Sequence, residues 1–225
     1  MTATVTTLLR KELRLELRTP QTVPAMALFS VTTFVVFHFA LQQRSVDGDL
    51  AAGILVVTLL FATILGINRL YVADREEGGF DAFLLAPVDR TALGVAKAIT
   101  LFAFLVLVEL VMLPDFTILL LGPGVGFEVV AKLVVVLVMV DVGLSVIGTL
   151  VGALAIQTRA RDLIGPLMAL PLLVPVVITA ARALSPVLGA GGAGALEARW
   201  LGVLGLYDLV FGLLAYAVFD FLLED

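Results

Sequence analysis

The sequence predicts an all-α integral membrane protein with six transmembrane helices, and three observations support this class. Apolar residues make up 61% of the 225 residues and charged residues 15%, against about 45–50% and about 25% in soluble domains. The mean hydropathy is +1.13, so the apolar excess should face hydrocarbon. Six apolar stretches are long enough to cross about 30 Å of hydrocarbon at about 1.5 Å per residue. We expect a single transmembrane domain over residues 1–225.

The predicted spans follow one another with short connections. They cover about residues 22–41, 50–70, 98–121, 127–156, 163–184 and 200–222. The third span contains Pro114, which removes a backbone donor and should kink or divide the helix. The fifth contains Pro166, Pro171 and Pro175, which free carbonyl groups that neighbouring helices or water must satisfy. We therefore expect the fifth helix to be buried or to line a pore, with Pro171 and Pro175 as pathway candidates.

Positive charges predict the orientation, because lysine and arginine in short loops accumulate on the cytoplasmic side. With a cytoplasmic N-terminus, ten such residues lie inside and four outside. The inside set is Arg10, Lys11, Arg14, Arg18, Arg69, Arg75, Arg90, Lys97, Arg159 and Arg161, and the outside set is Arg44, Lys132, Arg182 and Arg199. We expect both termini in the cytoplasm.

Charge and cysteine content exclude several classes of function. A net charge of -5 gives no basic surface for a phosphate backbone, so we expect no nucleic-acid partner. The absence of cysteine excludes disulfides, thiol catalysis and thiolate metal sites. Charges between Arg10 and Arg18 interrupt any apolar run that could serve as a cleaved signal peptide, so we expect the mature chain to keep its N-terminus.

Residues 4–18 predict an amphipathic helix that lies flat on the membrane. Val5, Leu9, Leu13 and Leu17 recur every four residues, and this apolar stripe should enter the headgroup boundary. The residues expected to meet anionic lipid are Arg10, Lys11, Arg14 and Arg18. The alternative is a plain positive anchor that only fixes the topology.

The connection over residues 74–90 changes character halfway along. An acidic cluster is followed by two glycines that permit a sharp turn, and then by apolar residues at helical spacing that Pro87 closes. Such a short helix, held between two spans, could dock in a groove of a soluble partner. The alternative is a loop that packs on the bilayer or on the protein's own helices. The candidate docking residues are Glu76, Glu77, Gly78, Phe80, Asp81, Phe83, Leu84, Leu85 and Pro87.

The sequence resembles the CcmB type of haem-exporter permease, a membrane component of the ABC complex of cytochrome c maturation system I. The resemblance is carried by residues 9–18, 77–88, 148–154 and 170–178. It implies an ABC-2-type permease fold in the bacterial inner membrane, in which two permease copies pair and each docks a separate ATPase subunit. The segment from about Glu76 to Pro87 then corresponds to the coupling helix. Asp115 and the glycine-rich loop at residues 189–194 depart from the expected pattern.

The resemblance also implies partners and a substrate. ATP binds the partner subunit, haem is the candidate substrate, and the other cytochrome c maturation membrane proteins and membrane lipid are the further partners. We expect no enzyme activity in this chain, since no Gly-x-x-x-x-Gly-Lys-Ser/Thr motif occurs. Two alternatives stay open: an ABC-2 permease that exports lipid, drug or polysaccharide, and a scaffold subunit that conducts nothing.

Four acids lie in or near the apolar spans: Glu109, Asp115, Asp141 and Asp208. An ionised acid at the bilayer centre costs at least about 2.5 kcal/mol, so each needs a reason. They could form a polar or proton-linked pathway, with Glu109 and Asp141 as the candidates furthest inside. Alternatively, they could be protonated or hydrogen-bonded acids that fasten helices together, or acids near the interface that reach water.

Metal binding and catalysis have little support. His38 is the only histidine, and although histidine often ligates haem iron, a lone histidine at a helix end is more often a packed side chain. We expect no metal site. Asp141 and Asp208 suggest an aspartyl intramembrane protease, but the Gly-x-Gly-Asp half of that signature is absent. Serine and zinc hydrolysis also lack their motifs.

Overall fold

The computed structural model describes residues 2–41, 45–76, 90–122, 125–156, 161–189 and 194–222, and the regular structure in these ranges is helical. The helices are α1 (Thr2–Arg18), α2 (Thr22–Leu41), α3 (Gly48–Glu76), α5 (Arg90–Phe116), α6 (Phe127–Ile156), α7 (Arg161–Leu184) and α8 (Ala198–Leu222), with a π-helical turn, η1, at Thr117–Leu121. Six helices in the described part of the chain are long and apolar enough to cross a membrane. The all-α membrane fold class is therefore confirmed.

Several helices extend beyond the predicted bounds. The α3 helix begins two residues before residue 50 and continues to Glu76, and α5 begins at Arg90 rather than at residue 98. The α1, α7 and α8 helices each begin two residues early. The physical reason is that hydropathy marks only the part of a helix that lies in hydrocarbon, whereas the helical hydrogen bonds continue into the charged flanks.

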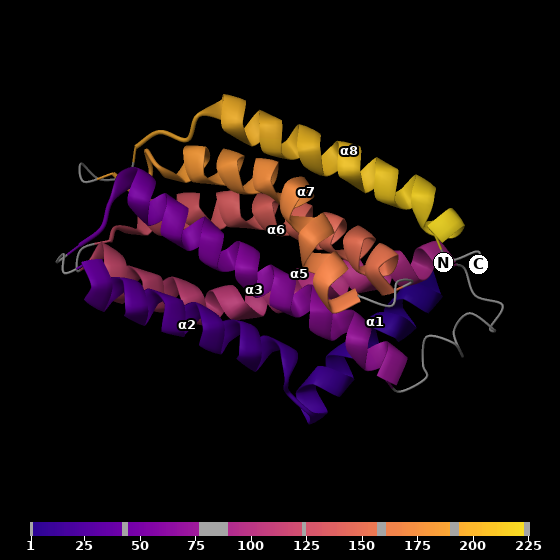
Figure 1. Ribbon diagram of the computed structural model, residues 1–225. Coiled ribbons are helices and arrows are strands. Elements are labelled where there is room, and N and C mark those ends of the chain that lie inside the picture. Colours follow the sequence, from indigo (N-terminus) through magenta and orange to yellow (C-terminus); the bar gives the residue numbers. More distant parts are fainter. Residues whose placement is uncertain are drawn as a thin grey trace.

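The helices form an elongated bundle in which α3 and α6 are central (Figure 1). In the most apolar 18-residue window of each helix, 72% of α3 and 67% of α6 is buried, against 6% of α8. The α6 helix packs against α3, α5, α7 and α8, and α3 packs against α2, α5, α6 and α7. The bundle thus leaves α2 and α8 with large apolar surfaces that lipid can cover.

Pro114 divides the third span in an unexpected way. The α5 helix passes through Pro114 and ends at Phe116, and the chain then widens into η1. The Gly122 amide donates to the Thr117 carbonyl, at 3.0 Å, and the Thr117 hydroxyl donates to the Pro114 carbonyl, at 2.9 Å. Pro114 removes the hydrogen bond to the carbonyl four residues before it, and the change of helical pitch at η1 begins three residues after it.

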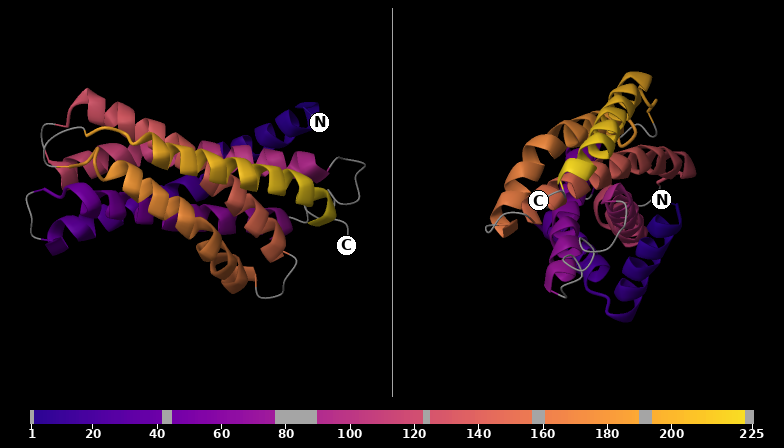
Figure 2. Two further views of the ribbon diagram at one scale, coloured as in Figure 1. Left: turned by 90° about the horizontal axis from the view of Figure 1, so that it is seen from above. Right: turned by 90° about the vertical axis from the view of Figure 1, so that its right-hand side faces the viewer.

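The α7 helix remains continuous despite its prolines, and Figure 2 shows it curved along its length. Pro171 and Pro175 lie on its exposed side. The Thr179 hydroxyl donates to the Pro175 carbonyl, at 2.8 Å, and the Tyr207 hydroxyl of α8 donates to the Leu172 carbonyl, at 2.9 Å. Part of the carbonyl row of α7 is thus bound by hydroxyl groups, as expected where prolines interrupt a membrane helix.

Candidate functional site at the α1 end of the bundle

One end of the bundle gathers four segments that are far apart in the sequence. Helix α1, the last turn of α3, the first turn of α5 and the last turn of α8 all lie there, and we name it the α1 end (Figures 1 and 2). The predicted docking segment joins α3 to α5, so both of its attachment points belong to this end. Glu76 is the last residue of α3. The other predicted docking residues, from Glu77 to Pro87, lie outside the described residues.

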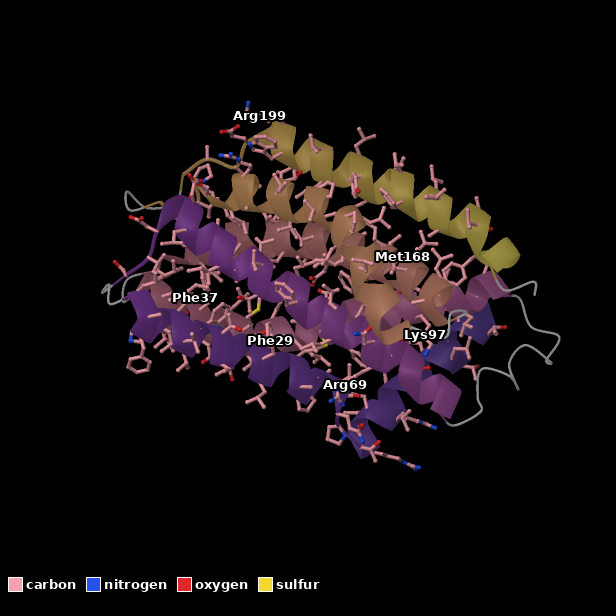
Figure 3. All side chains as sticks on the ribbon, in the orientation of Figure 1. Phe29, Phe37, Arg69, Lys97, Met168 and Arg199 are labelled. Carbon is pink, nitrogen blue, oxygen red and sulfur yellow. The ribbon has the colours of Figure 1, made fainter. Side chains whose placement is uncertain are left out.

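Lys97 lies at the α1 end, between α1, α3 and α5 (Figure 3). It is 2% exposed, which is unusual for a lysine. Its Nζ donates to Glu12 Oε1 of α1, at 2.9 Å, and to the Leu70 carbonyl of α3, at 3.0 Å. Glu12 is itself only 8% exposed. One ammonium group of α5 therefore binds α1 and α3 at the same time.

This arrangement satisfies the requirements for burying a charge. A buried ammonium or carboxylate costs several kcal/mol unless it is paired and hydrogen-bonded. Lys97 has both an opposite charge and a backbone acceptor, and its removal would leave the buried Glu12 carboxylate with only the partly exposed Lys11 at 3.7 Å. The contact therefore holds α1 in place next to α5, where Figure 2 shows it set obliquely against the bundle.

A second carboxylate fixes the corner between α1 and α2. Glu16 Oε1 accepts hydrogen bonds from the backbone amides of Gln21, at 3.1 Å, and Val23, at 2.8 Å. The first amides of a helix lack intrahelical partners and attract negative charge, so Glu16 caps α2 from the preceding helix. Glu12 and Glu16 together tie α1 to its neighbours in the bundle.

The remaining faces of α1 are divided between the bundle and the outside. The predicted lipid-contacting residues Arg10, Lys11, Arg14 and Arg18 are all exposed. Leu8 and Leu13 pack against the buried apolar core, whereas Leu17 is 83% exposed. The packed side of α1 therefore follows Leu8 and Glu12, and the predicted stripe ending at Leu17 meets the bundle only in part.

A cavity of about 140 Å³ lies between α5, α6 and α8. Its lining is apolar apart from two threonines and a tyrosine, and it includes Gly94 and Ala98 of α5, Val146 of α6, and Gly212 and Phe219 of α8. The cavity occupies the part of these helices that leads to the α1 end. It is an apolar gap in the packing of these three helices.

The structure brings two of the predicted pathway acids together. Glu109 of α5 and Asp141 of α6 are both buried, and their carboxyl groups lie close enough for their charges to interact. Pro171 and Pro175, on the exposed side of α7, lie apart from this buried position. Within the described ranges, no group of three or more His, Cys, Asp or Glu side chains could hold a metal ion.

At the end of the bundle opposite α1, polar groups close the helix ends. His38 Nδ1 is 2.5 Å from the Leu119 carbonyl, and the Val46 amide donates to the Leu120 carbonyl, at 2.7 Å. These contacts bind carbonyls of η1 that have no helical partner. Arg199 forms an ion pair with Glu197 at 2.6 Å and lies over the Trp200 ring.

Sequence reasoning missed Glu12, Glu16 and Lys97 as site residues. Lys97 was considered only as a positive charge that sets the orientation. Glu12 and Glu16 were considered only as part of residues 9–18, and neither was assigned a role. A signal was present, because Lys97 lies on the apolar stripe of Leu93 and Leu101, where a solvated lysine would not be expected.

The fold and this end of the bundle define a polytopic helical membrane protein whose charged residues concentrate at the ends of its spans. The chain belongs to the CcmB protein family, whose model matches residues 3–221. It is 31% identical to heme exporter protein B of Rhodobacter capsulatus over 78% of this chain and 79% of that protein. It is 28% identical to heme exporter protein B of Pseudomonas aeruginosa over 79% of this chain and 78% of that protein, and 29% identical to that of Paracoccus denitrificans over 77% and 78%.

Proposed function

We propose that this chain is the membrane permease subunit of an ABC transporter that exports or handles haem during cytochrome c biogenesis. The family membership and the names of the relatives support haem as the substrate. The proposal includes an ABC-2-type arrangement with a second permease copy and a separate ATPase subunit. The other membrane proteins of cytochrome c maturation would complete the complex. In this role the chain transmits force and does not itself hydrolyse ATP.

The observation that carries the coupling mechanism is the double contact of Lys97. We infer that a docking segment transmits its displacement most directly when the helices at both of its ends are joined to each other. Lys97 joins the end of α3 to the start of α5 through the Leu70 carbonyl, and adds α1 through Glu12. A push on residues 80–85 would therefore reach all three helices together, and acids at Glu76, Glu77 and Asp81 would orient the ATPase by charge.

The orientation follows from the same mechanism. ATP is cytoplasmic, so the α1 end must face the cytoplasm, and this agrees with the excess of lysine and arginine in the connections at that end. We place the protein in the bacterial inner membrane with both termini in the cytoplasm. Arg182 and Arg199 would then face the periplasm, where their charges could attract the propionates of haem.

Substitution of Phe83 and Leu84 by aspartate tests the coupling role. The double variant should lose co-purification of the ATPase, because two charges would occupy an apolar groove, while membrane insertion should persist. The matched control is Phe83→Leu with Leu84→Met, which keeps the segment apolar and should keep the complex. Retention of the ATPase by the aspartate variant would contradict the coupling assignment.

Haem transport and scaffolding are separated by a second measurement. A permease should support ATP-dependent loading of a haem chaperone, and the Phe83 and Leu84 aspartate variant should lose that loading together with the ATPase. A scaffold would lose assembly of the complex without any ATP-dependent step. Equal loading with and without ATP hydrolysis would therefore contradict the permease role.

A further inference from the structure

We propose that Glu109 and Asp141 form a proton-binding carboxyl pair inside the membrane, a site that goes beyond the coupling mechanism above. Glu109 belongs to α5 and Asp141 to α6, and these two helices pack directly against each other. Both acids face the interior of the bundle. Glu109 is 7% exposed and Asp141 is 0% exposed.

The two carboxyl groups lack the partners that buried polar groups normally have. Glu109 Oε1 and both carboxyl oxygens of Asp141 are buried without a hydrogen-bond partner. A buried polar atom without a partner is rare and costly, and more so if it is charged. The described protein groups supply no donor to these three oxygens, which favours a neutral, protonated carboxyl group over a carboxylate at this position.

Both acids lie well inside their helices. Glu109 precedes Leu121, the end of η1, by twelve residues, which is about 18 Å at 1.5 Å per residue. Asp141 follows Phe127, the start of α6, by fourteen residues, or about 21 Å. Both groups are therefore more than two helical turns from these two helix ends, which lie at the end of the bundle opposite α1.

The charged groups on the surrounding helices do not compensate the pair. The described basic side chains lie towards the ends of the helices: Arg69 and Lys97 near the α1 end, and His38, Lys132, Arg182 and Arg199 near the opposite end. Lys97 binds Glu12, Lys132 binds Glu128, and His38 contacts the Leu119 carbonyl. Two buried carboxylates whose charges interact in an apolar interior cannot both be ionised at an acceptable free energy.

A proton fits this site better than a metal ion. Calcium takes about six to eight oxygen ligands and magnesium demands about six in octahedral geometry, whereas the site offers two carboxyl groups. A proton on either carboxyl group supplies one donor and removes one of the two interacting charges. The pair therefore holds at least one proton, and movement of α5 against α6 would change how tightly that proton is held.

Asp208 of α8 is a separate group. A Cβ at Gly143 would lie 2.5 Å from Asp208 Oδ1, so this carboxyl group lies directly against α6 at Gly143. Residues 141 and 143 are two apart in one helix and point to different sides. Asp208 therefore approaches α6 on another face and does not complete the Glu109 and Asp141 pair.

Carbodiimide labelling tests the proposal. Dicyclohexylcarbodiimide is an apolar reagent that reacts with protonated carboxyl groups: the O–H adds across a C=N bond, and the product rearranges to a stable N-acylurea. Native membranes containing the full-length protein in its complex would be treated, and the labelled peptides identified by mass spectrometry. We expect labelling at Glu109 or Asp141 and none at Asp49, an exposed acid in the first turn of α3.

Infrared spectroscopy gives a second readout of the same proton. The protonated carboxyl C=O band should shift on transfer to D₂O, and it should decrease in Glu109→Gln and Asp141→Asn but not in the control Asp49→Asn. Labelling restricted to Asp49, or a spectrum with only carboxylate bands, would overturn the proposal. Suppression of labelling by Na⁺ or Mg²⁺ at constant pH would overturn it in favour of a cation site. None of these readouts depends on haem or on ATP, so they can fail while the proposed function holds.

Discussion

Lys97 and Glu12 are separated by 85 residues in the sequence, yet their side chains form a buried ion pair of 2.9 Å. Lys11 approaches the same Glu12 oxygen at 3.7 Å, but its side chain is 46% exposed. The two lysines thus differ mainly in burial. The free energy of an ion pair depends strongly on whether its partners can return to water. Of the two lysines, therefore, only Lys97 should contribute strongly to holding α1 against the bundle.

Lys97→Ala should destabilise the protein strongly. The substitution leaves the Glu12 carboxylate buried without its partner, and breaking one half of a buried pair costs about 3–5 kcal/mol. We expect a lower midpoint of thermal unfolding in detergent and faster protease cleavage at the corner after Arg18, where α1 joins α2. Both quantities can be measured on the purified protein.

Two matched variants test whether the burial of the ion pair between Lys97 and Glu12 causes the loss of stability. Lys11→Ala removes the exposed lysine from the same carboxylate and should cost no more than about 1 kcal/mol. The double variant Glu12→Leu with Lys97→Met replaces both charges by apolar groups and should recover much of the lost stability. Equal losses for Lys97→Ala and Lys11→Ala would show that the pair does not hold α1.

The six spans were predictable because a bilayer leaves the chain few choices. Backbone groups in hydrocarbon must bond within the segment, so a long apolar stretch such as residues 127–156 has to be a helix, and α6 occupies that range. Hydropathy cannot find the helix ends in the same way. Arg75 and Arg90 are charged but still belong to α3 and α5, because charge excludes a residue from hydrocarbon and not from a helix.

The contacts at the α1 end were not predictable in the same way. Each depends on the packing of helices that are distant in sequence, and the pattern of α1 alone allows it to lie on lipid or on α5. The acids Glu109 and Asp141 show the same limit. The sequence identified them as the innermost acids, but only the packing of α5 against α6 makes them neighbours.

Gly94→Ala should disturb the seam between α5 and α8. A Cβ at Gly94 would lie 2.6 Å from three ring atoms of Phe219, which is 4% exposed. The ring would have to shift towards the cavity that it also lines, so we expect a loss at the lower end of about 1–3 kcal/mol, measured as a lower midpoint of thermal unfolding. The effect should appear without any change in the charge of the protein.

Gly212→Ala is the matched control for this seam. Gly212 lines the same cavity from α8, but a Cβ there would have no heavy atom within 4 Å. Alanine favours a helix over glycine by about 1 kcal/mol, so this variant should be neutral or slightly more stable. A loss of stability as large as that of Gly94→Ala would contradict the contact with Phe219.

His38→Ala should weaken the end of the bundle opposite α1 without affecting haem. With its proton on Nδ1, the ring donates to the Leu119 carbonyl, at 2.5 Å, and this carbonyl is one of the last in η1. Loss of one hydrogen bond near a helix end costs about 1 kcal/mol, so we expect a small decrease in the unfolding midpoint. Val36→Ala, which removes two methyl groups from the exposed side of the same helix, should have a smaller effect. We expect haem that co-purifies with the complex to keep its Soret band in His38→Ala, because the contact with the Leu119 carbonyl gives this histidine a structural role. A reduced Soret band with an unchanged unfolding midpoint would contradict this assignment and would make His38 an axial ligand.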